Sequence, residues 1–193
     1  SKPYLKMHAD NWANKAKQMG YRSRAAFKLE EILNKLSSKK HYQNVLDIGS
    51  SPGGWSQYII KKYINAKVYA VDLLEMEPID RVYFYQESIE NIDNIHEIKE
   101  LKGKFNLVIS DIAPNITGIS AIDGENIFEL NQLTIEVAKN FLDSGGTLIM
   151  KTFQNNMLKS LRKDMELSFK IVQTYKPAAS KKQSGEIYLY GVK

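Results

Sequence analysis

The fold of this chain is decided by NVLDIGSSPGG, residues 44–54. Its apolar half, 44–48, predicts a buried strand, and the residues after its glycine-rich half, 55–63, predict a helix. A strand that passes through a glycine turn into a helix is the building unit of open α/β sheets, whose ligands bind at the carboxyl ends of the strands. The stretch therefore predicts an α/β fold with a ligand site beside residues 49–54.

Strands and helices alternate on both sides of this stretch. Before it, we predict helices over 8–19 and 22–36, with Ser23 placed to cap the second. After it, we predict strands over 67–72, 82–86, 105–110, 147–152, 169–175 and 186–192, and helices over 92–101, 125–142 and 156–167, with a polar loop over 116–124. No helix separates the last two strands, so they pair as a hairpin and the final strand is antiparallel. We expect a single domain over 1–193, in which 1–40 form a basic helical extension packed on a mostly parallel sheet.

Composition excludes several classes of protein. The chain has 193 residues, no cysteine and three scattered histidines. The lack of thiols excludes disulfide scaffolds, zinc ribbons, iron–sulfur clusters and thiol nucleophiles, and we expect no metal site. No apolar run approaches the roughly 20 residues of a membrane span, and no signal peptide is recognisable. We expect an intracellular protein without a membrane partner; an organelle such as the mitochondrion, the nucleus and the cytoplasm stay open.

Positive charge is concentrated toward the two ends of the chain. The formal net charge is +5, composed of +7 in residues 1–40, −7 in 41–158 and +5 in 159–182. If the two basic segments meet in space, they form a face suited to a polyanion, most commonly a nucleic acid. A lysine-rich solvated surface is the alternative, because lysine supplies 23 of the 27 cationic residues.

The glycine turn has the pattern of a nucleoside site. It lacks the G-x-G-x-x-G of dinucleotide binders and the Gly-Lys-Ser/Thr of a P-loop, and Pro52 removes a backbone donor that a phosphate would use. Asp72 ends the strand 67–72, where a carboxylate can accept both hydroxyls of a ribose. S-adenosylmethionine is a nucleoside of this kind, and its sulfonium suits the acidic middle of the chain. A purely structural turn with a strand-capping aspartate is the alternative.

Three motifs carry a family resemblance: DIGSSPGGWSQ at 47–57, DLL at 72–74 and SDIAPN at 110–115. With RSRAAFKL at 22–29 and EIY at 186–188, they resemble the FtsJ/RrmJ family of RNA 2′-O-methyltransferases over nearly the whole chain. The resemblance implies a Rossmann-like, S-adenosylmethionine-dependent methyltransferase. Its seven-stranded sheet would have the order 3-2-1-4-5-7-6, with the last strand antiparallel and the N-terminal helices added.

The same resemblance implies a catalytic tetrad of Lys28, Asp111, Lys151 and Glu186. Asp111 and Lys151 stand at the ends of two strands, and Lys151 follows an apolar run in which an idle charge is costly. A neutral Lys151 could accept the proton of a ribose 2′-hydroxyl if burial and the ammonium of Lys28 favour the uncharged amine. It could equally hold the developing alkoxide by its charge. A structural cluster of ion pairs is the alternative to catalysis.

The resemblance also implies the residues that hold the cofactor. They are Gly49, Ser50, Ser51, Pro52, Gly53, Gly54, Trp55, Asp72, Leu73, Ser88, Ile89 and Asp111. Ser88 departs from the pattern of the ribosomal-RNA members, which have an aspartate that meets the adenine amino group. Adenine recognition by Ser88, by the backbone or by Glu87 stays open.

The expected substrate is ribosomal RNA or a ribosomal subunit, and the expected product a 2′-O-methylated ribose, most simply of a uridine in large-subunit RNA. Methylation of transfer RNA or of a cap, and an inactive cofactor-binding assembly factor, are the alternatives. We expect a monomer that contacts RNA through four basic residues. These are Arg22, Arg24, Lys181 and Lys182.

Overall fold

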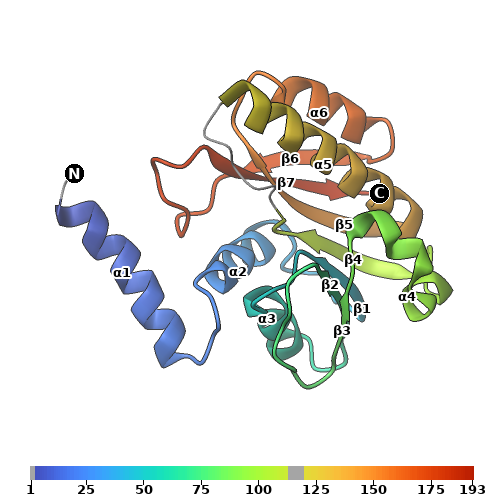
Figure 1. Cartoon of the computed structure of the whole chain (residues 1–193), viewed down its shortest axis with the longest axis horizontal. Coiled ribbons are helices and arrows are strands. Elements are labelled where there is room, and N and C mark those ends of the chain that lie inside the picture. The colour runs from blue at the N-terminus through green and yellow to red at the C-terminus, as the bar shows by residue number, and fades with distance from the viewer. Residues whose placement is uncertain (1–2, 113–119) are drawn as a thin grey trace.

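The computed structural model describes residues 3–112 and 120–193 of the chain (Figure 1). Within these ranges, seven strands form one sheet in the order β3-β2-β1-β4-β5-β7-β6. They are β1 Asn44–Ile48, β2 Lys67–Asp72, β3 Val82–Gln86, β4 Phe105–Ser110, β5 Leu142–Phe153, β6 Ile171–Tyr175 and β7 Glu186–Val192. β7 is antiparallel to both of its neighbours, and the other pairings are parallel. The predicted strand order and direction are confirmed.

Helices cover both faces of the sheet. They are α1 Pro3–Gln18, α2 Ala25–Leu36, α3 Gly54–Lys62, the 3₁₀ helix η1 Ile89–Asn94, α4 His96–Glu100, α5 Ser120–Phe141 and α6 Leu158–Glu166. α2 and α3 pack on one face of the sheet, and α5 and α6 pack on the other, at the top of Figure 1. The start of α1 extends away from the other elements at the left of that view. No helix of the described ranges is both long and apolar enough to cross a membrane.

Each face of the sheet has its own hydrophobic core. Val45 of β1 packs with α2 and α3, whereas the next residue, Leu46, packs with α4 and α5. Because successive side chains of a strand point to opposite faces, a strand buried on both sides needs an unbroken apolar run. This explains why the apolar runs at 44–48 and 105–110 marked their strands well.

The segment after β3 differs from the prediction of one helix over 92–101. It forms η1 and α4, separated by Ile95 in an extended conformation. The physical reason is the spacing of its buried isoleucines, which recur at every third residue: Ile89, Ile92, Ile95 and Ile98. An interval of three aligns side chains on a 3₁₀ helix better than on an α-helix.

The prediction of a loop over 116–124 is wrong for residues 120–124, because α5 begins at Ser120. Gly124 lies inside that helix, where a glycine costs only about 1 kcal/mol. Residues 113–119, which include the end of the SDIAPN motif, lie outside the described residues.

The topology brings the chemically interesting residues to one edge of the sheet. Asp72 and Asp111 stand at the carboxyl ends of β2 and β4, and Lys151 lies near the carboxyl end of β5. β7 runs the opposite way, so its first residue, Glu186, pairs with Phe153 at the same edge. The site is therefore expected at this carboxyl edge.

Candidate active site at the carboxyl edge of the sheet

Two lysine–carboxylate pairs stand side by side at this edge. Nζ of Lys28, from α2, lies 2.6 Å from Oε1 of Glu186. Nζ of Lys151 lies 3.7 Å from Oδ1 of Asp111, beyond ordinary hydrogen-bond length. The structure thus brings together the four residues that the sequence analysis singled out. The amine of Lys151 is held less tightly than that of Lys28.

Tyr188 joins the two pairs, and the sequence analysis did not identify it. Its hydroxyl lies 2.8 Å from Oδ1 of Asp111 and 3.1 Å from Oε1 of Glu186. It stands two residues after Glu186, on the same face of β7, and pairs in register with Lys151. That spacing was the available signal, because a tyrosine in an apolar strand otherwise looks like core.

Burial and charge act on these groups in opposite directions. Burial raises the pKa of the Asp111 carboxyl, and the charges of Lys151 and Lys28 and the Tyr188 hydroxyl offset this only in part. Burial acts on Glu186 in the same sense, but the hydrogen bond and charge of Lys28 more than compensate and leave its pKa lowered. Burial followed by the two carboxylates raises the pKa of Tyr188 well above its usual value. Tyr188 therefore stays a phenol that donates its proton.

Hydrogen bonds hold the loop between β6 and β7 next to Glu186. The Ser180 hydroxyl lies 3.3 Å from Oε1 of Glu186. Nζ of Lys176 donates to the backbone carbonyls of Ser184 and Glu186. Glu31, one turn after Lys28 on α2, accepts hydrogen bonds from the Tyr175 hydroxyl at 2.7 Å and the Ala178 amide at 3.0 Å. One face of α2 thus holds both the loop and the carboxylate that the loop precedes.

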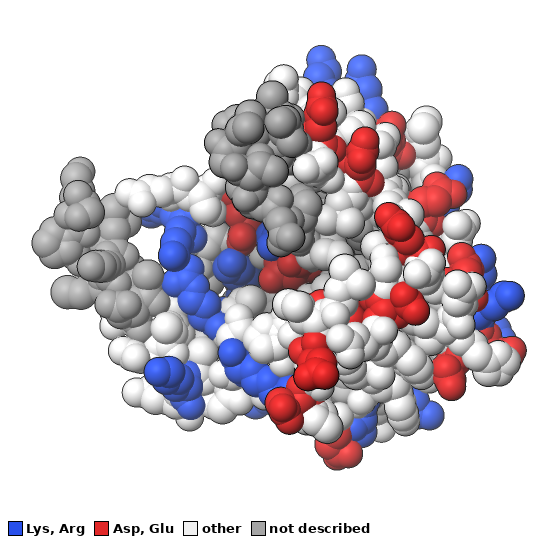
Figure 2. Space-filling model, viewed as in Figure 1, with Lys and Arg blue, Asp and Glu red and all other residues white. Residues whose placement is uncertain are grey.

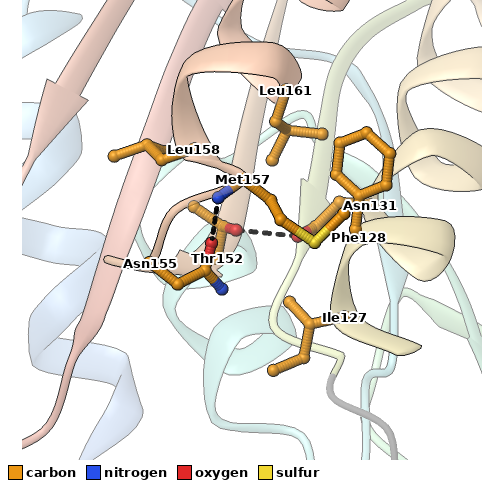
Figure 3. Close-up of a pocket in the computed structure, with 8 residues that line it drawn as sticks. All are labelled: Ile127, Phe128, Asn131, Thr152, Asn155, Met157, Leu158 and Leu161. Carbon is orange, nitrogen blue, oxygen red and sulfur yellow. Dashed lines mark hydrogen bonds between the residues drawn. The ribbon is translucent and has the colours of Figure 1, made fainter. Parts of the chain in front are cut away.

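The strand end that carries Lys151 is fixed from the opposite face of the sheet. The amide of Asn131, on α5, donates to the carbonyl of Lys151 at 2.9 Å, and its oxygen accepts from the Thr152 hydroxyl at 2.7 Å. Figure 3 shows Asn131 and Thr152 pointing toward one another beside a small pocket. The pocket is lined by Ile127, Phe128, Asn131, Thr152, Asn155, Met157, Leu158 and Leu161. These contacts orient the backbone of Lys151 from behind.

The glycine turn lies directly beside the tetrad and packs without room for side chains. Gly49 has φ +73°, and a Cβ there would lie 2.7 Å from Cβ of Ile112, the residue after Asp111. Gly53 has φ +122°, a conformation that side-chain-bearing residues rarely adopt. Trp55 is buried, donates its indole N–H to the carbonyl of Ala25 at 2.7 Å and packs against the ring of Tyr188. The turn therefore packs directly against residues that adjoin the tetrad, Ile112 and Tyr188.

Asp72 organises the other wall of this turn. Its Oδ2 accepts the amide of Ser51 at 2.8 Å, and its Oδ1 accepts the amide of Leu74 at 2.8 Å. A carboxylate keeps further acceptor capacity after two such bonds. Leu73 exposes two thirds of its side chain next to Asp72, whereas Pro52 joins the wall through its carbonyl.

Three buried oxygens at the ends of β1 and β4 have no hydrogen-bond partner among the described residues: Oδ1 of Asp47 and the hydroxyls of Ser50 and Ser110. Buried polar groups of this kind are rare without a ligand or water. Together with the close-packed glycines and two carboxylates, they suit a polar, positively charged nucleoside. The donor set therefore fits S-adenosylmethionine. No cluster of acidic and histidine side chains in the described ranges has the make-up of a metal site.

The carboxylate of Asp47 makes the stability of the protein depend on pH. Burial raises its pKa to about 7; the hydroxyl of Ser56 opposes this, and the charges of Asp111 and Asp72 add to it. The unfolded chain loses this proton near the ordinary pKa of 3.8, so folding is favoured below that pH and stability falls as the pH rises toward 7.

Asp47→Asn is expected to remove this decline, on the order of 4 kcal/mol at 1.4 kcal/mol for each pKa unit. Urea unfolding of both proteins at intervals from pH 4 to pH 8 measures it. Asp80→Asn, at an exposed position, serves as the control. Parallel pH curves for wild type and Asp47→Asn would contradict the assignment.

The segment after β3 shows how the departure at Ser88 is accommodated. The hydroxyl of Ser88 accepts the amide of Glu90 and caps η1. Oε1 of Glu87 accepts the amide of Ser88 at 2.9 Å and the side-chain amide of Asn91 at 3.0 Å. The side chain of Ile89, the first residue of η1, is buried and packs into the hydrophobic core.

The four predicted RNA contacts fall into different surroundings. Lys181 and Lys182 are exposed on the loop that leads to Glu186, and Arg24 is half-buried just before α2. The guanidinium of Arg22 is directed to backbone carbonyls of two loops. Figure 2 shows Lys and Arg side chains gathered around a hollow on the left side of the molecule, while Asp and Glu side chains dominate the right.

Comparisons with known proteins identify the family of the chain. The family model described as FtsJ-like methyltransferase matches residues 21–193. The chain is 38% identical to the ribosomal RNA large subunit methyltransferase E of Dechloromonas aromatica, over 99% of this chain and 95% of the relative. It is 40% identical to the protein of that name from Wigglesworthia glossinidia brevipalpis, over 96% and 92% of the two chains. A crystal structure described as a ribosomal RNA methyltransferase from Plasmodium falciparum superposes with a TM-score of 0.77 at 34% identity, over 89% of this chain and 97% of that one.

Proposed function

Since the chain belongs to the FtsJ-like methyltransferase family, we propose that it transfers the methyl group of S-adenosylmethionine to a ribose 2′-hydroxyl of ribosomal RNA. The observation that carries this proposal is the joining of two lysine–carboxylate pairs by Tyr188, directly beside a close-packed glycine turn. The names of the relatives support large-subunit RNA as the target, and within that RNA we propose a uridine.

Cofactor binding is assigned to the turn Gly49–Trp55, to Asp72 and to the start of the loop after β4. When bound, S-adenosylmethionine supplies a methyl group activated by its sulfonium. Asp72 would accept the ribose hydroxyls of the cofactor, and Asp111 would place negative charge near the cationic end of the ligand. The turn contributes close backbone approach, because side chains at Gly49 and Gly53 would collide with neighbouring loops.

The two lysine–carboxylate pairs of the tetrad have different roles in this proposal. Lys28 and Glu186 form the tighter pair and fix the floor of the site. Nζ of Lys151 would take the proton from the ribose 2′-oxygen as that oxygen gains the methyl group, or hold the oxygen by its charge until the proton leaves. Tyr188 keeps both carboxylates in place through its hydroxyl. Alignment of the oxygen with the methyl carbon is the larger part of such a displacement.

The proposal is tested by methyl transfer in vitro. Large ribosomal subunits or their RNA are isolated from cells that lack the protein and incubated with it and S-adenosylmethionine labelled in the methyl group. We expect label in large-subunit RNA, at a position that resists alkaline cleavage because the 2′-oxygen is blocked. Label on a base, or on transfer RNA in place of ribosomal RNA, would redirect the assignment. Cofactor binding without any methyl transfer would favour an assembly factor.

We further propose that RNA docks on the basic face formed by Arg24, Lys181 and Lys182. The two lysines follow Ser180, whose hydroxyl contacts Glu186, so their loop adjoins the reacting group. Arg24 stands one turn before Lys28 on the same side of the site. A polyanion bound there would cover the carboxyl edge of the sheet.

Lys181→Ala with Lys182→Ala is expected to weaken RNA binding and to reduce the slope of log K against log salt by about 1.5, since two phosphate contacts are lost. The double variant Lys67→Ala with Lys104→Ala removes the same charge from exposed positions at the amino ends of β2 and β4. Binding titrations at several salt concentrations compare the two. The docking face is wrong if both double variants show the same slope.

A further inference from the structure

Arg22 ties two loops together at the cofactor side of the site. Its Nη1 donates to the carbonyl of Pro52 at 3.1 Å and to that of Glu77 at 2.6 Å, and its Nη2 donates to that of Pro78 at 2.9 Å. Pro52 belongs to the glycine turn, whereas Glu77 and Pro78 belong to the loop between β2 and β3. A single planar guanidinium thus bridges segments that are 25 residues apart in the chain.

The backbone of Arg22 is itself fixed. Its amide donates to Oε1 of Gln57 on α3 at 2.8 Å, and Nε2 of Gln57 returns a bond of 3.1 Å to the carbonyl of Gly20. The neighbouring Tyr21 is buried and packs edge-on against Phe27. The guanidinium is therefore presented by a segment that is held at several points.

The two bridged loops are those that shape the expected nucleoside site. Ser51 donates its amide to Asp72 and its hydroxyl, at 2.9 Å, to the carbonyl of Glu75. A Cβ on Gly53 would lie 2.7 Å from Cδ1 of Ile79 and 3.3 Å from Nη1 of Arg22. The glycine turn and the loop after β2 are therefore in contact, and the guanidinium of Arg22 binds carbonyl groups of both.

We propose that Arg22 is a positioning residue for cofactor binding, not a phosphate contact. It holds the glycine turn against the loop after Asp72 and so maintains the spacing in which the carboxylate of Asp72 meets a ribose. This inference rests on the proposed use of S-adenosylmethionine. It separates Arg22 from Lys181 and Lys182, with which its charge alone would group it.

Arg22→Lys is expected to raise the dissociation constant of S-adenosylhomocysteine about tenfold, because one ammonium cannot span three carbonyls on two loops. Titration calorimetry measures the constant. Arg22→Gln, which removes the charge, is expected to lose affinity for S-adenosylhomocysteine as well, while the salt slope of RNA binding stays at the wild-type value because no phosphate contact is lost.

The chain offers a matched control in Arg81. Its guanidinium also binds three backbone carbonyls, those of Ile60, Ile64 and Ala66, but Arg81 lies just before β3 at the opposite edge of the sheet. Arg81→Lys is expected to lower the melting temperature about as much as Arg22→Lys does, while leaving the affinity for S-adenosylhomocysteine unchanged.

Two outcomes overturn the inference: wild-type affinity in Arg22→Lys, or an equal loss of affinity in Arg81→Lys. A reduced salt slope with intact cofactor affinity in Arg22→Gln would make Arg22 a phosphate contact. Hydrogen exchange on the unaltered protein gives a second test that does not depend on folding of a variant. S-adenosylhomocysteine is expected to slow exchange at residues 20–24 and 75–79, and unchanged rates there count against the inference. If the wild-type protein binds no S-adenosylhomocysteine, the proposed function fails instead.

Discussion

Lys151→Met is expected to lower the rate of methyl transfer about 1,000-fold, because a positioned acid or base contributes a rate factor of this order. Methionine matches the length and the apolar stem of lysine, so the packing of β5 is retained. Among the described residues, the ammonium of Lys151 makes no hydrogen bond, and its nearest carboxylate oxygen is 3.7 Å away. It is therefore the amine of the site that is free to serve a substrate oxygen. Single-turnover transfer to ribosomal RNA measures the loss, with S-adenosylhomocysteine affinity as the check on folding.

Lys151→Arg distinguishes the two roles left open for this amine. Arginine keeps the positive charge but is not deprotonated in proteins, so it can hold an alkoxide and cannot accept its proton. A rate as low as that of Lys151→Met indicates proton transfer, whereas a substantial remaining rate indicates charge stabilisation. Near-wild-type transfer by Lys151→Met would remove Lys151 from the mechanism altogether.

Asp72→Ala is expected to weaken S-adenosylhomocysteine binding about 100-fold, because bonds to a charged acceptor are lost together with the geometry of the turn. The carboxylate does two things at once: it fixes the amides of Ser51 and Leu74, and it faces the expected ribose. Asp72→Asn keeps one acceptor oxygen and should lose less affinity. Calorimetry again provides the measurement.

Asp80→Ala is the control for Asp72→Ala, because it removes the same charge from an exposed position of the loop that follows Asp72. Its affinity for S-adenosylhomocysteine is expected to equal that of the wild type. If Asp72→Ala bound the ligand as tightly as Asp80→Ala, the nucleoside site would have to lie elsewhere.

The strands were predictable because local pattern and burial agree. β1, β2, β3, β4 and β7 have the predicted bounds, since their apolar runs are bounded by turn residues. Helix bounds were less accurate, because helix ends depend on packing that the sequence pattern does not contain. The isoleucines of η1 and α4 show the limit well: their interval of three marks a buried face, but it does not say where the backbone bends.

Local sequence pattern could not predict which lysine of the site pairs with which carboxylate. The sequence and the family resemblance supplied Lys28, Asp111, Lys151 and Glu186, but the choice of Glu186 as the partner of Lys28 depends on contacts 158 residues apart. Arg22 illustrates the same point for function. In the sequence it is one more cation of a basic segment, and only its carbonyl partners distinguish it.

The place of β7 in the sheet has a consequence for synthesis of the protein. β7 follows the other six described strands in the chain, yet it lies between β5 and β6. During translation, β6 therefore has no neighbour to pair with until residues 186–192 have left the ribosome. The same strand brings Glu186 and Tyr188, so a nascent chain that already contains the glycine turn and both lysines still lacks one carboxylate of the tetrad and the tyrosine that links its two pairs. The catalytic site is therefore complete only when the sheet is complete. A chain that ends before β7 leaves the edge of β5 unpaired, and an exposed edge of this kind promotes aggregation.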